Sequence, residues 1–433
     1  MANSRNQREN RMTRLCFIVL CATVLFVGRA EADTLTLQEC LKKAAAANHE
    51  LRVSSYDEKL AAEGVAIARS GYLPRLDLQG GYTFQQAPQS VLISGYAIPT
   101  QQDDYGFLSM AAEQTIYDFG RTSARYERAK ALRNASALNY TAREKDVFLQ
   151  VVEAYYGILE FRNFLTSAEE EVVQMTDHLR VAKNLFEQGV VTRNDLLQAE
   201  VQLANSSQRR LAEENRFTNG WLYLNYLTGQ PPGYRADLVE TVQGENSPAE
   251  AGNPFNPANR AEVQALKQGI LADELTMKEV RSYYFPEIFA RLGMDYVQNS
   301  KVVEQTILSA TIGVRVNLFD GLATTSRYRQ AVQSRAQAEE KLRMAESQIR
   351  LEYQTAGNDA RTALERIRTA ETAVKSGEEN LRINKNRYLE HVGTATDVID
   401  AQTLLTRTRT EYHRAVFDYQ VAVARIKKAK GEL

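Results

Sequence analysis

The sequence predicts a mixed α/β membrane protein that arose by internal duplication, with four β-strands and several very long coiled-coil helices in each chain. Three observations support this prediction. Segments recur at a fixed offset, pairs of short segments alternate between apolar and polar residues, and apolar residues recur every seven positions over long stretches without proline. The first pattern indicates duplication, the second indicates β-strands and the third indicates coiled-coil helices.

The duplication appears as matching segments at two offsets. The offset is 202 residues for 186–200 with 388–402 and for 116–129 with 318–331. It is 212 residues for 69–74 with 281–286. Shared helix-ending chemistry would explain one match, but several matches at one offset indicate a repeat. The change in offset means that the second copy lacks about ten residues near its hairpin. The predicted parts are a signal peptide at 1–32, a first repeat at 33–228, a connector at 229–257 and a second repeat at 258–433.

The N-terminal segment has the pattern of a secretory signal peptide. Four arginines precede an apolar run over residues 15–27, and Ala30-Glu31-Ala32 offers a cleavage site. Removal of residues 1–32 takes away five arginines and two glutamates, so the formal net charge changes from −1 to −4. This charge does not suggest nucleic-acid binding, and Cys40, as the only remaining cysteine, cannot form an intramolecular disulfide.

Each repeat is predicted to contain a helix, a β-hairpin, a very long helix, a tight turn and a returning helix. In the first repeat the chain begins with a helix over 37–72, for which Thr36 and Glu39 form a capping box. The other expected elements are strands at 75–85, 105–117, 288–296 and 308–318, and helices at 121–188, 194–227, 324–390 and 396–430. Residues 86–104 contain Pro88, Gly95 and Pro99 and are expected to form an exposed loop.

The strand segments alternate strictly between two faces. In residues 75–85, for example, Leu76, Leu78, Tyr82 and Phe84 alternate with polar residues. A length of about ten residues suits a strand that crosses a bilayer. Ordinary soluble hairpins remain the alternative.

The two longest helices show heptad spacing. In the first, Ile158, Leu165, Val172, Leu179 and Phe186 are seven residues apart. In the second, the small residues Ala356, Ala363 and Ala370 have the same spacing. About 68 residues at 1.5 Å each give about 100 Å, several times the ~30 Å bilayer core. Most of each helix must therefore lie in water.

The number of strands requires several chains to assemble. Four strands cannot close a barrel, and an open sheet edge in lipid would leave backbone groups unpaired. Known closed membrane barrels begin at about eight strands. Three chains would give twelve strands, although periodicity alone does not choose three.

This arrangement resembles the TolC-type outer membrane efflux protein family over essentially the whole chain after residue 32. The matching signatures are LTLQECLKKAAAANHEL at 35–51, the proline-tipped entry to each hairpin, IYDFGR and LFDGLA after each hairpin, and the two turn motifs. The resemblance implies a homotrimer with a 12-stranded β-barrel in the outer membrane, continuous with a coiled-coil α-helical barrel in the periplasm. It also implies a periplasmic adaptor (membrane fusion protein) and an inner-membrane RND or ABC transporter as partners.

The resemblance also places the periplasmic mouth of the duct at the second turn. Asp397 and Asp400 share a helix face, and in a trimer they would form two carboxylate rings that select cations. Helix capping by Asp397 and simple solvation of Asp400 are the alternatives.

Tyr388 and Asp195 match the expected gate partners, although packing alone would also explain Tyr388. A basic residue expected at the second turn is replaced by Gly393, and His391 replaces a glycine; Arg193 and Arg387 are candidate substitutes. The expected adaptor-contact tips are Gly189, Val190, Val191, Thr192, Val392, Gly393 and Thr394, whose glycines are equally explained by turn formation.

The predicted function is a passive export duct with no catalytic residues, cofactor or metal site. No nucleophile triad, phosphate-binding loop or His/Cys ligand spacing suggests an enzyme. A periplasmic coiled-coil scaffold protein is the alternative from another class. Drug efflux and type I protein secretion are not distinguished, because the pump selects the substrate, while metal-ion efflux is less favoured without Met or His enrichment.

Overall fold

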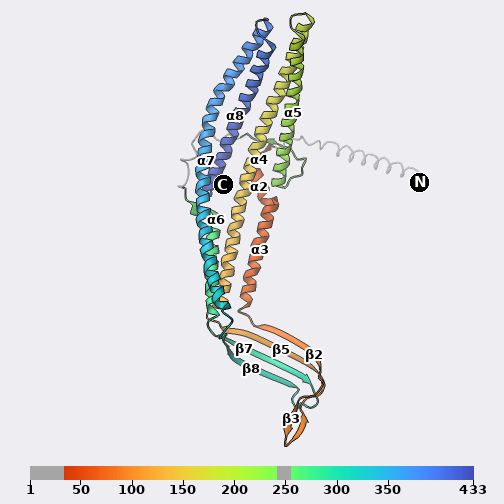
Figure 1. The fold of residues 1–433 in the computed structure, drawn as a ribbon, viewed down its shortest axis with the longest axis vertical. Helices are drawn as coiled ribbons and strands as arrows, with labels where there is room; N and C mark the ends of the chain where they lie inside the picture. Colours follow the sequence, from red (N-terminus) through yellow and green to blue (C-terminus); the bar gives the residue numbers. More distant parts are fainter. Residues whose placement is uncertain (1–33, 241–254) are drawn as a thin grey trace, which may run out of the picture.

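The computed structural model describes residues 34–240 and 255–433, which form an elongated molecule with a β-sheet at one end and two helical turns at the other (Figure 1). The predicted signal peptide at 1–32 lies outside the described residues, as does the central part of the predicted connector. Within the described ranges, no helix is both long enough and apolar enough to cross a membrane.

The first helical segment differs from the prediction because it is broken at Asn48. Two helices, α2 (Leu37–Ala47) and α3 (His49–Ser70), replace the single helix expected over 37–72. The Asn48 side chain accepts hydrogen bonds from the backbone N–H groups of Glu50 and Leu51, so it caps α3. Its amide nitrogen donates to the carbonyl oxygen of Leu227, which ties the break to a distant helix.

The remaining helices match the predicted ones and have equal lengths in the two halves. The long helices α4 (Arg121–Glu187) and α7 (Ala323–Leu389) each contain 67 residues. The returning helices α5 (Arg193–Thr228) and α8 (Ala395–Lys430) each contain 36. Helix α6 (Ala261–Ser282) has 22 residues, as α3 does. These equal lengths, together with the 202 and 212 offsets, give the chain two repeat-like halves.

The four predicted strands form one antiparallel sheet. They are β2 (Arg75–Phe84), β5 (Asp104–Tyr117), β7 (Glu287–Gln298) and β8 (Thr306–Arg315), in that order across the sheet. The register places Leu78 opposite Met110, Met110 opposite Met294, and Met294 opposite Leu308. One face of the sheet is therefore apolar along all four strands, while the opposite face carries polar pairs such as Glu113 with Arg315.

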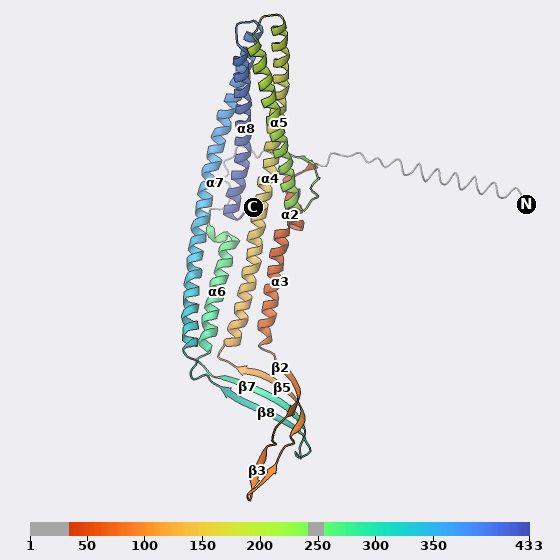
Figure 2. The same ribbon diagram turned by 45° about the vertical axis from the view of Figure 1, so that its right-hand side comes forward.

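The predicted loop at 86–104 contains a small hairpin, so the prediction of a plain loop was wrong. Strands β3 (Ser90–Ile93) and β4 (Tyr96–Pro99) pair across Ser94 and Gly95, both of which have positive φ. This turn matches the right-handed twist of a two-residue hairpin. The hairpin projects beyond the main sheet (Figure 2), and the shorter second copy has no counterpart there among the described residues.

Three apolar clusters hold the helices together. The largest lies where α2, α4, α5 and α8 meet, and it includes Tyr155, Trp221 and Phe417. The short parallel strands β1 (Thr34–Leu35) and β6 (Asp237–Leu238) border this cluster, and a short 3₁₀ turn, η1 (Pro257–Asn259), precedes α6. Two further clusters join α7 to α8, one rich in alanine and one close to the second helical turn.

Candidate functional site

The two helical turns lie side by side at the end of the molecule farthest from the sheet (Figures 1 and 2). Each returning helix begins with the same capping box. Thr192 and Asp195 exchange hydrogen bonds at the start of α5, with Asp195 Oδ2 2.9 Å from the Thr192 nitrogen. Thr394 and Asp397 repeat this at the start of α8, also at 2.9 Å. Reciprocal capping fixes the direction in which each helix leaves its turn.

The two turns differ at the residue that takes a left-handed conformation. Gly189 occupies this position in the first turn, with φ 73°, and His391 occupies it in the second, with φ 61°. A side chain at positive φ is strained, which glycine avoids. The second turn therefore forms despite its histidine, and Gly393 follows it closely packed against Arg387.

The two candidate pore residues, Asp397 and Asp400, have different surroundings in the single chain. Asp397 is committed to the capping box, and its hydrogen bonds with Thr394, reinforced by the charge of Arg387, hold the pKa of its carboxyl below the usual value. Asp400 is exposed one turn farther along α8. The capping alternative for Asp397 thus describes its local contacts in one chain, while the two rings of carboxylates stay a prediction about an assembly.

The candidate gate residues do not form a hydrogen bond with each other in the described chain. Tyr388 is 5% exposed in the apolar cluster near the second turn, and its hydroxyl has no hydrogen-bond partner among the described residues. Burial, and then the charge of Asp195, raise the pKa of Tyr388. The ring of His178 on α4 lies 5.3 Å from the ring of Tyr388. Tyr388 therefore packs as a core residue between α4 and α7, and a gate formed with Asp195 stays a prediction.

The candidate substitutes for the absent basic residue also differ. Arg387 Nη2 donates to the carbonyl oxygen of Val392 at 3.4 Å, so it braces the second turn from within. Arg193 is exposed at the first position of α5. Both arginines lie close to the turns, and Arg387 contacts the second turn through this hydrogen bond.

The predicted adaptor contacts are accessible. Val190 is 48% exposed and Val392 is 68% exposed, and Gly189, Thr192 and Thr394 are exposed beside them. Val191 and Gly393 are half-buried. The tips thus present small apolar groups to solvent, which is what a docking contact requires, and their role in docking stays a prediction.

Sequence reasoning missed a row of ion pairs between α4 and α8. Arg409 pairs with Glu170, Arg414 with Glu160 at 3.4 Å, Arg425 with Glu153 at 2.8 Å, and Lys428 with Asp146. A cavity of about 450 Å³ opens beside Arg409, between Glu170 and Glu378. The partners lie far apart in the chain, so no local spacing could have indicated them.

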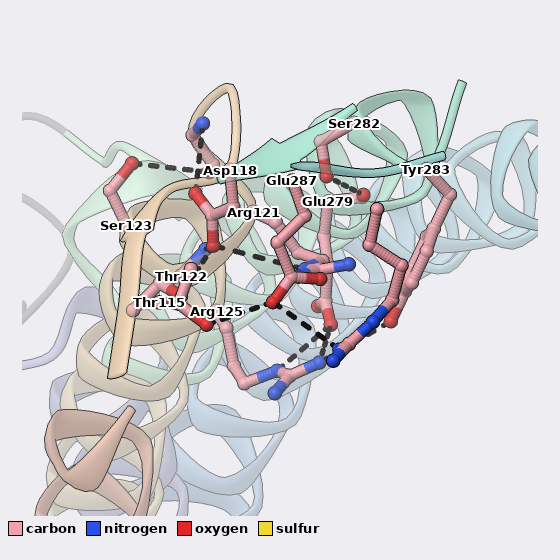
Figure 3. Close-up of polar contacts among 12 residues, drawn as sticks. Thr115, Asp118, Arg121, Thr122, Ser123, Arg125, Glu279, Ser282, Tyr283 and Glu287 are labelled. Carbon is pink, nitrogen blue, oxygen red and sulfur yellow. Dashed lines mark hydrogen bonds and ion pairs between the residues drawn. The ribbon is translucent and has the colours of Figure 1, made fainter. Parts of the chain in front are cut away.

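It also missed a polar network where the sheet meets the helices (Figure 3). Arg121 on α4 pairs with Glu287 on β7, and Glu287 accepts a hydrogen bond from Thr115 at 2.9 Å. Arg125 and Arg128 pair with Glu279 on α6, at 3.0 and 3.3 Å. These contacts join the first half of the chain to the second.

The chemistry of the described residues offers no metal centre. Across residues 34–240 and 255–433, no cluster of three or more His, Cys, Asp or Glu side chains is placed to hold a metal ion.

Comparison with known proteins gives a family match over most of the chain. A family model described as "Outer membrane efflux protein" matches residues 40–230 and 257–432. The outer membrane protein TolC of Vibrio cholerae is 22% identical over 385 residues, which cover 86% of this chain and 85% of that protein. The alkaline protease secretion protein AprF of Pseudomonas aeruginosa is 21% identical over 383 residues, covering 85% and 78%.

A solved structure has the same fold. The outer membrane protein VceC of Vibrio cholerae superposes with a TM-score of 0.79 at 16% identity, covering 91% of this chain and 96% of that chain. Identity this low supports a likeness of fold and nothing finer.

Proposed function

The chain belongs to the outer membrane efflux protein family, and on this premise we propose that three copies form one passive export duct through the outer membrane. This membership confirms the predicted outer membrane location and the predicted role in export. In our proposal the three sheets close a twelve-stranded barrel, and the helices continue it as a tunnel into the periplasm.

The observation that carries the proposal is a four-stranded sheet with two unpaired edges and one apolar face. Within residues 34–240 and 255–433, strands β2 and β8 each have a neighbouring strand on one side only. An unpaired edge in lipid costs several kcal/mol for each unsatisfied backbone group. A second copy supplies the missing neighbour, because adjacent strands alternate in direction and β8 would meet the next β2 in antiparallel orientation.

The apolar face then has an obvious environment. Leu78, Leu308 and Ile312 lie on it and are largely exposed in a single chain. In a closed barrel this face would contact lipid, and the face that carries Glu113 and Arg315 would line the lumen. The 67-residue helices, at about 1.5 Å per residue, would extend about 100 Å from the barrel.

The helical tips would meet a periplasmic adaptor, and the energy for export would come from an inner-membrane pump. Relatives named as an outer membrane efflux protein and as a protease secretion protein leave the cargo open between small molecules and proteins. Substrate choice would then reside in the pump, since the described chain contributes a conduit.

Cell fractionation tests the proposal against a periplasmic scaffold. We expect the protein in outer membrane fractions as a trimer that resists mild detergent and dissociates on heating. Release of a single chain by osmotic shock, without detergent, would support the scaffold instead.

The predicted carboxylate rings have a separate test. Replacing both Asp397 and Asp400 with Ala is expected to reduce cation selectivity, and block by multivalent cations, in planar bilayer recordings, because like charges crowded at a constriction attract cations. Since replacing Asp397 also removes a cap, Thr394→Ala is the matched control, because it removes the Thr394 hydroxyl from the same capping box and keeps both carboxylates. Selectivity that is the same in the double variant and the unmodified protein would rule out the rings.

A further inference from the structure

Each copy contains an internal contact that shows how it meets the next copy. We infer that α7 of one copy packs on α3 of its neighbour as α4 packs on α6 within the chain, and that β8 pairs with the neighbour's β2 with Ile312 opposite Tyr82. This inference rests on the proposed trimer and specifies its interface.

The two hairpins of the sheet have the same register, which justifies the mapping. Leu78 pairs with Met110 in the first hairpin. Adding 212 and 202 to these numbers gives Ala290 and Ile312, which pair in the second hairpin. Strand β7 therefore repeats β2, and β8 repeats β5.

The contact between the hairpins then predicts the contact between copies. Met110 on β5 pairs with Met294 on β7. The repeat partner of Met110 is Ile312 on β8, and that of Met294 is Tyr82 on β2. Both residues lie on the apolar face of the sheet, so this register keeps that face continuous around a closed barrel.

The exposed side chains of α3 give independent support for the helical part of this contact. Three positions at heptad spacing on α6 are buried, and Glu279 among them binds Arg125 and Arg128 of α4, so this face is directed at α4. Ala272 on this face is 4% exposed, whereas its repeat partner on α3, Leu60, is 69% exposed. The full sets are Ala265, Ala272 and Glu279 on α6 and Val53, Leu60 and Ile67 on α3, and the latter are all exposed.

Helix α7 differs from α4 in the same way, because residues that are buried on α4 have exposed repeat partners on α7. On α4, the face that carries Arg128 buries Ala124, Ala131 and Ala142. Their repeat partners on α7 are Ser326, Gln333 and Met344, and all three are exposed. Helices α3 and α7 of each copy thus each present an uncovered version of a surface that is covered within the chain. In the proposed assembly these two surfaces are the two sides of one contact.

The boundary between copies is chemically different from its internal counterpart. The internal boundary is joined by the ion pairs of Figure 3. At the boundary between copies, Ile67 stands in place of Glu279, and Ala323 stands in place of Arg121. The acid that binds Arg125 and Arg128 and the base that binds Glu287 are therefore both absent, and larger apolar side chains replace two buried alanines. The copies would be held by strand pairing and apolar contact.

Disulfide cross-linking tests the register. Residues directly opposite in an antiparallel pair have Cα atoms about 4.5–5.5 Å apart, within the range of a disulfide. A variant with Ile312→Cys and Tyr82→Cys is expected to form a covalent ladder up to three chains in oxidised outer membranes. The matched control, Ile312→Cys with Phe84→Cys, shifts one cysteine by two residues on the same face, to about 7–8 Å, and is expected to stay unlinked. Cys40 is buried and stays in both variants.

The outcomes separate the register from the trimer. If the control pair forms the disulfide and the first pair does not, the inferred register is overturned and the proposed duct stands. The same conclusion follows if neither pair forms a disulfide in a protein that still has the mass of three chains. A protein that has the mass of one chain would overturn both.

A second variant pair tests the helical part. Leu60→Asp on α3 should lower the yield of trimer several-fold, because it would place a carboxylate in the apolar contact. Leu271→Asp on α6 is the matched control, since Leu271 is exposed and its repeat partner, Lys59, is also exposed. Equal yields for the two variants would contradict the predicted contact of α3.

Discussion

The contacts within each helical pair differ in kind from the contacts between the pairs. Helices α4 and α5 share a large apolar cluster with Tyr155 and Trp221, to which α8 contributes Phe417, and α7 and α8 share two smaller clusters. On the tip side of Phe417, in contrast, α4 and α8 are joined by the ion pairs of Arg409 and Arg414, whose side chains are partly exposed. Exposed ion pairs contribute little stability, whereas buried apolar residues contribute several kcal/mol each. Each pair is therefore expected to move as a unit, and the seam between the pairs is where they separate most easily.

The largest effect should come from the apolar cluster. Tyr155 is fully buried, and its hydroxyl donates to the carbonyl oxygens of Leu35 and Val239, at 3.1 and 2.7 Å. Tyr155→Ala is expected to cost about 3–5 kcal/mol, as for other large buried aromatics, which thermal unfolding would detect. Tyr223→Ala, at an exposed site on α5, should change stability by less than about 0.5 kcal/mol. Similar losses at the two sites would contradict the role assigned to the cluster.

A smaller effect should appear at the tip end of the seam as pH falls. Burial, and then the charge of Lys385, lower the pKa of His178, which packs against Tyr388. The opened state takes up a proton near the ordinary value of about 6.5, and the closed state does so only at lower pH. The closed seam is therefore fully stable above about pH 6.5 and loses stability as pH falls from there towards the lower pKa.

Hydrogen exchange at the end of α7 would measure this loss. After correction for the intrinsic effect of pH on exchange rates, the backbone amides there are expected to exchange faster at about pH 5.5 than at about pH 7.5. His178→Phe should remove the difference, while His49→Gln, on the exposed surface of α3, should keep it. Persistence of the difference in His178→Phe would assign it to other groups.

The smallest effect on stability should come from the ion pairs. Arg409 on α8 joins Glu170 on α4 and Glu378 on α7. Arg409→Ala is expected to cost less than about 1 kcal/mol but to widen the duct, which would appear as higher conductance in bilayers. The gain over the unmodified protein should shrink at high salt, because salt already screens the pairs. Arg407→Ala removes an ion pair within α8 alone, so an equal rise in that variant would refute the seam as the site of opening.

Periodicity explains why much of the fold was predictable. Alternation located the four strands, heptads located the long helices, and the capping box of Thr36 and Glu39 was predicted. Capping by Asp397 was weighed only as an alternative, and the matching box of Thr192 and Asp195 was not predicted. The break at Asn48 was missed because the sequence around it keeps a helical pattern, and it depends on a contact with Leu227. The β3–β4 hairpin was missed because proline and glycine suggested a loop, although Ser94-Gly95 suits a tight turn.

The site was less predictable because its contacts are long-range. The tips and their exposure followed from the turn motifs. The ion pairs of Arg409 and Arg414 join residues more than 200 positions apart, and the packing of His178 on Tyr388 depends on how two long helices align. No sequence period contains that information. A gate role of Tyr388, in addition to its packing role, likewise depends on the arrangement of neighbouring copies.

The mass of the protein extracted from outer membranes in mild detergent tests the central claim most directly, when measured by native mass spectrometry. The unpaired edges of β2 and β8 predict an assembly with the mass of three mature chains. A single chain that is stable in the same detergent, with both edges exposed to solvent, would contradict the account.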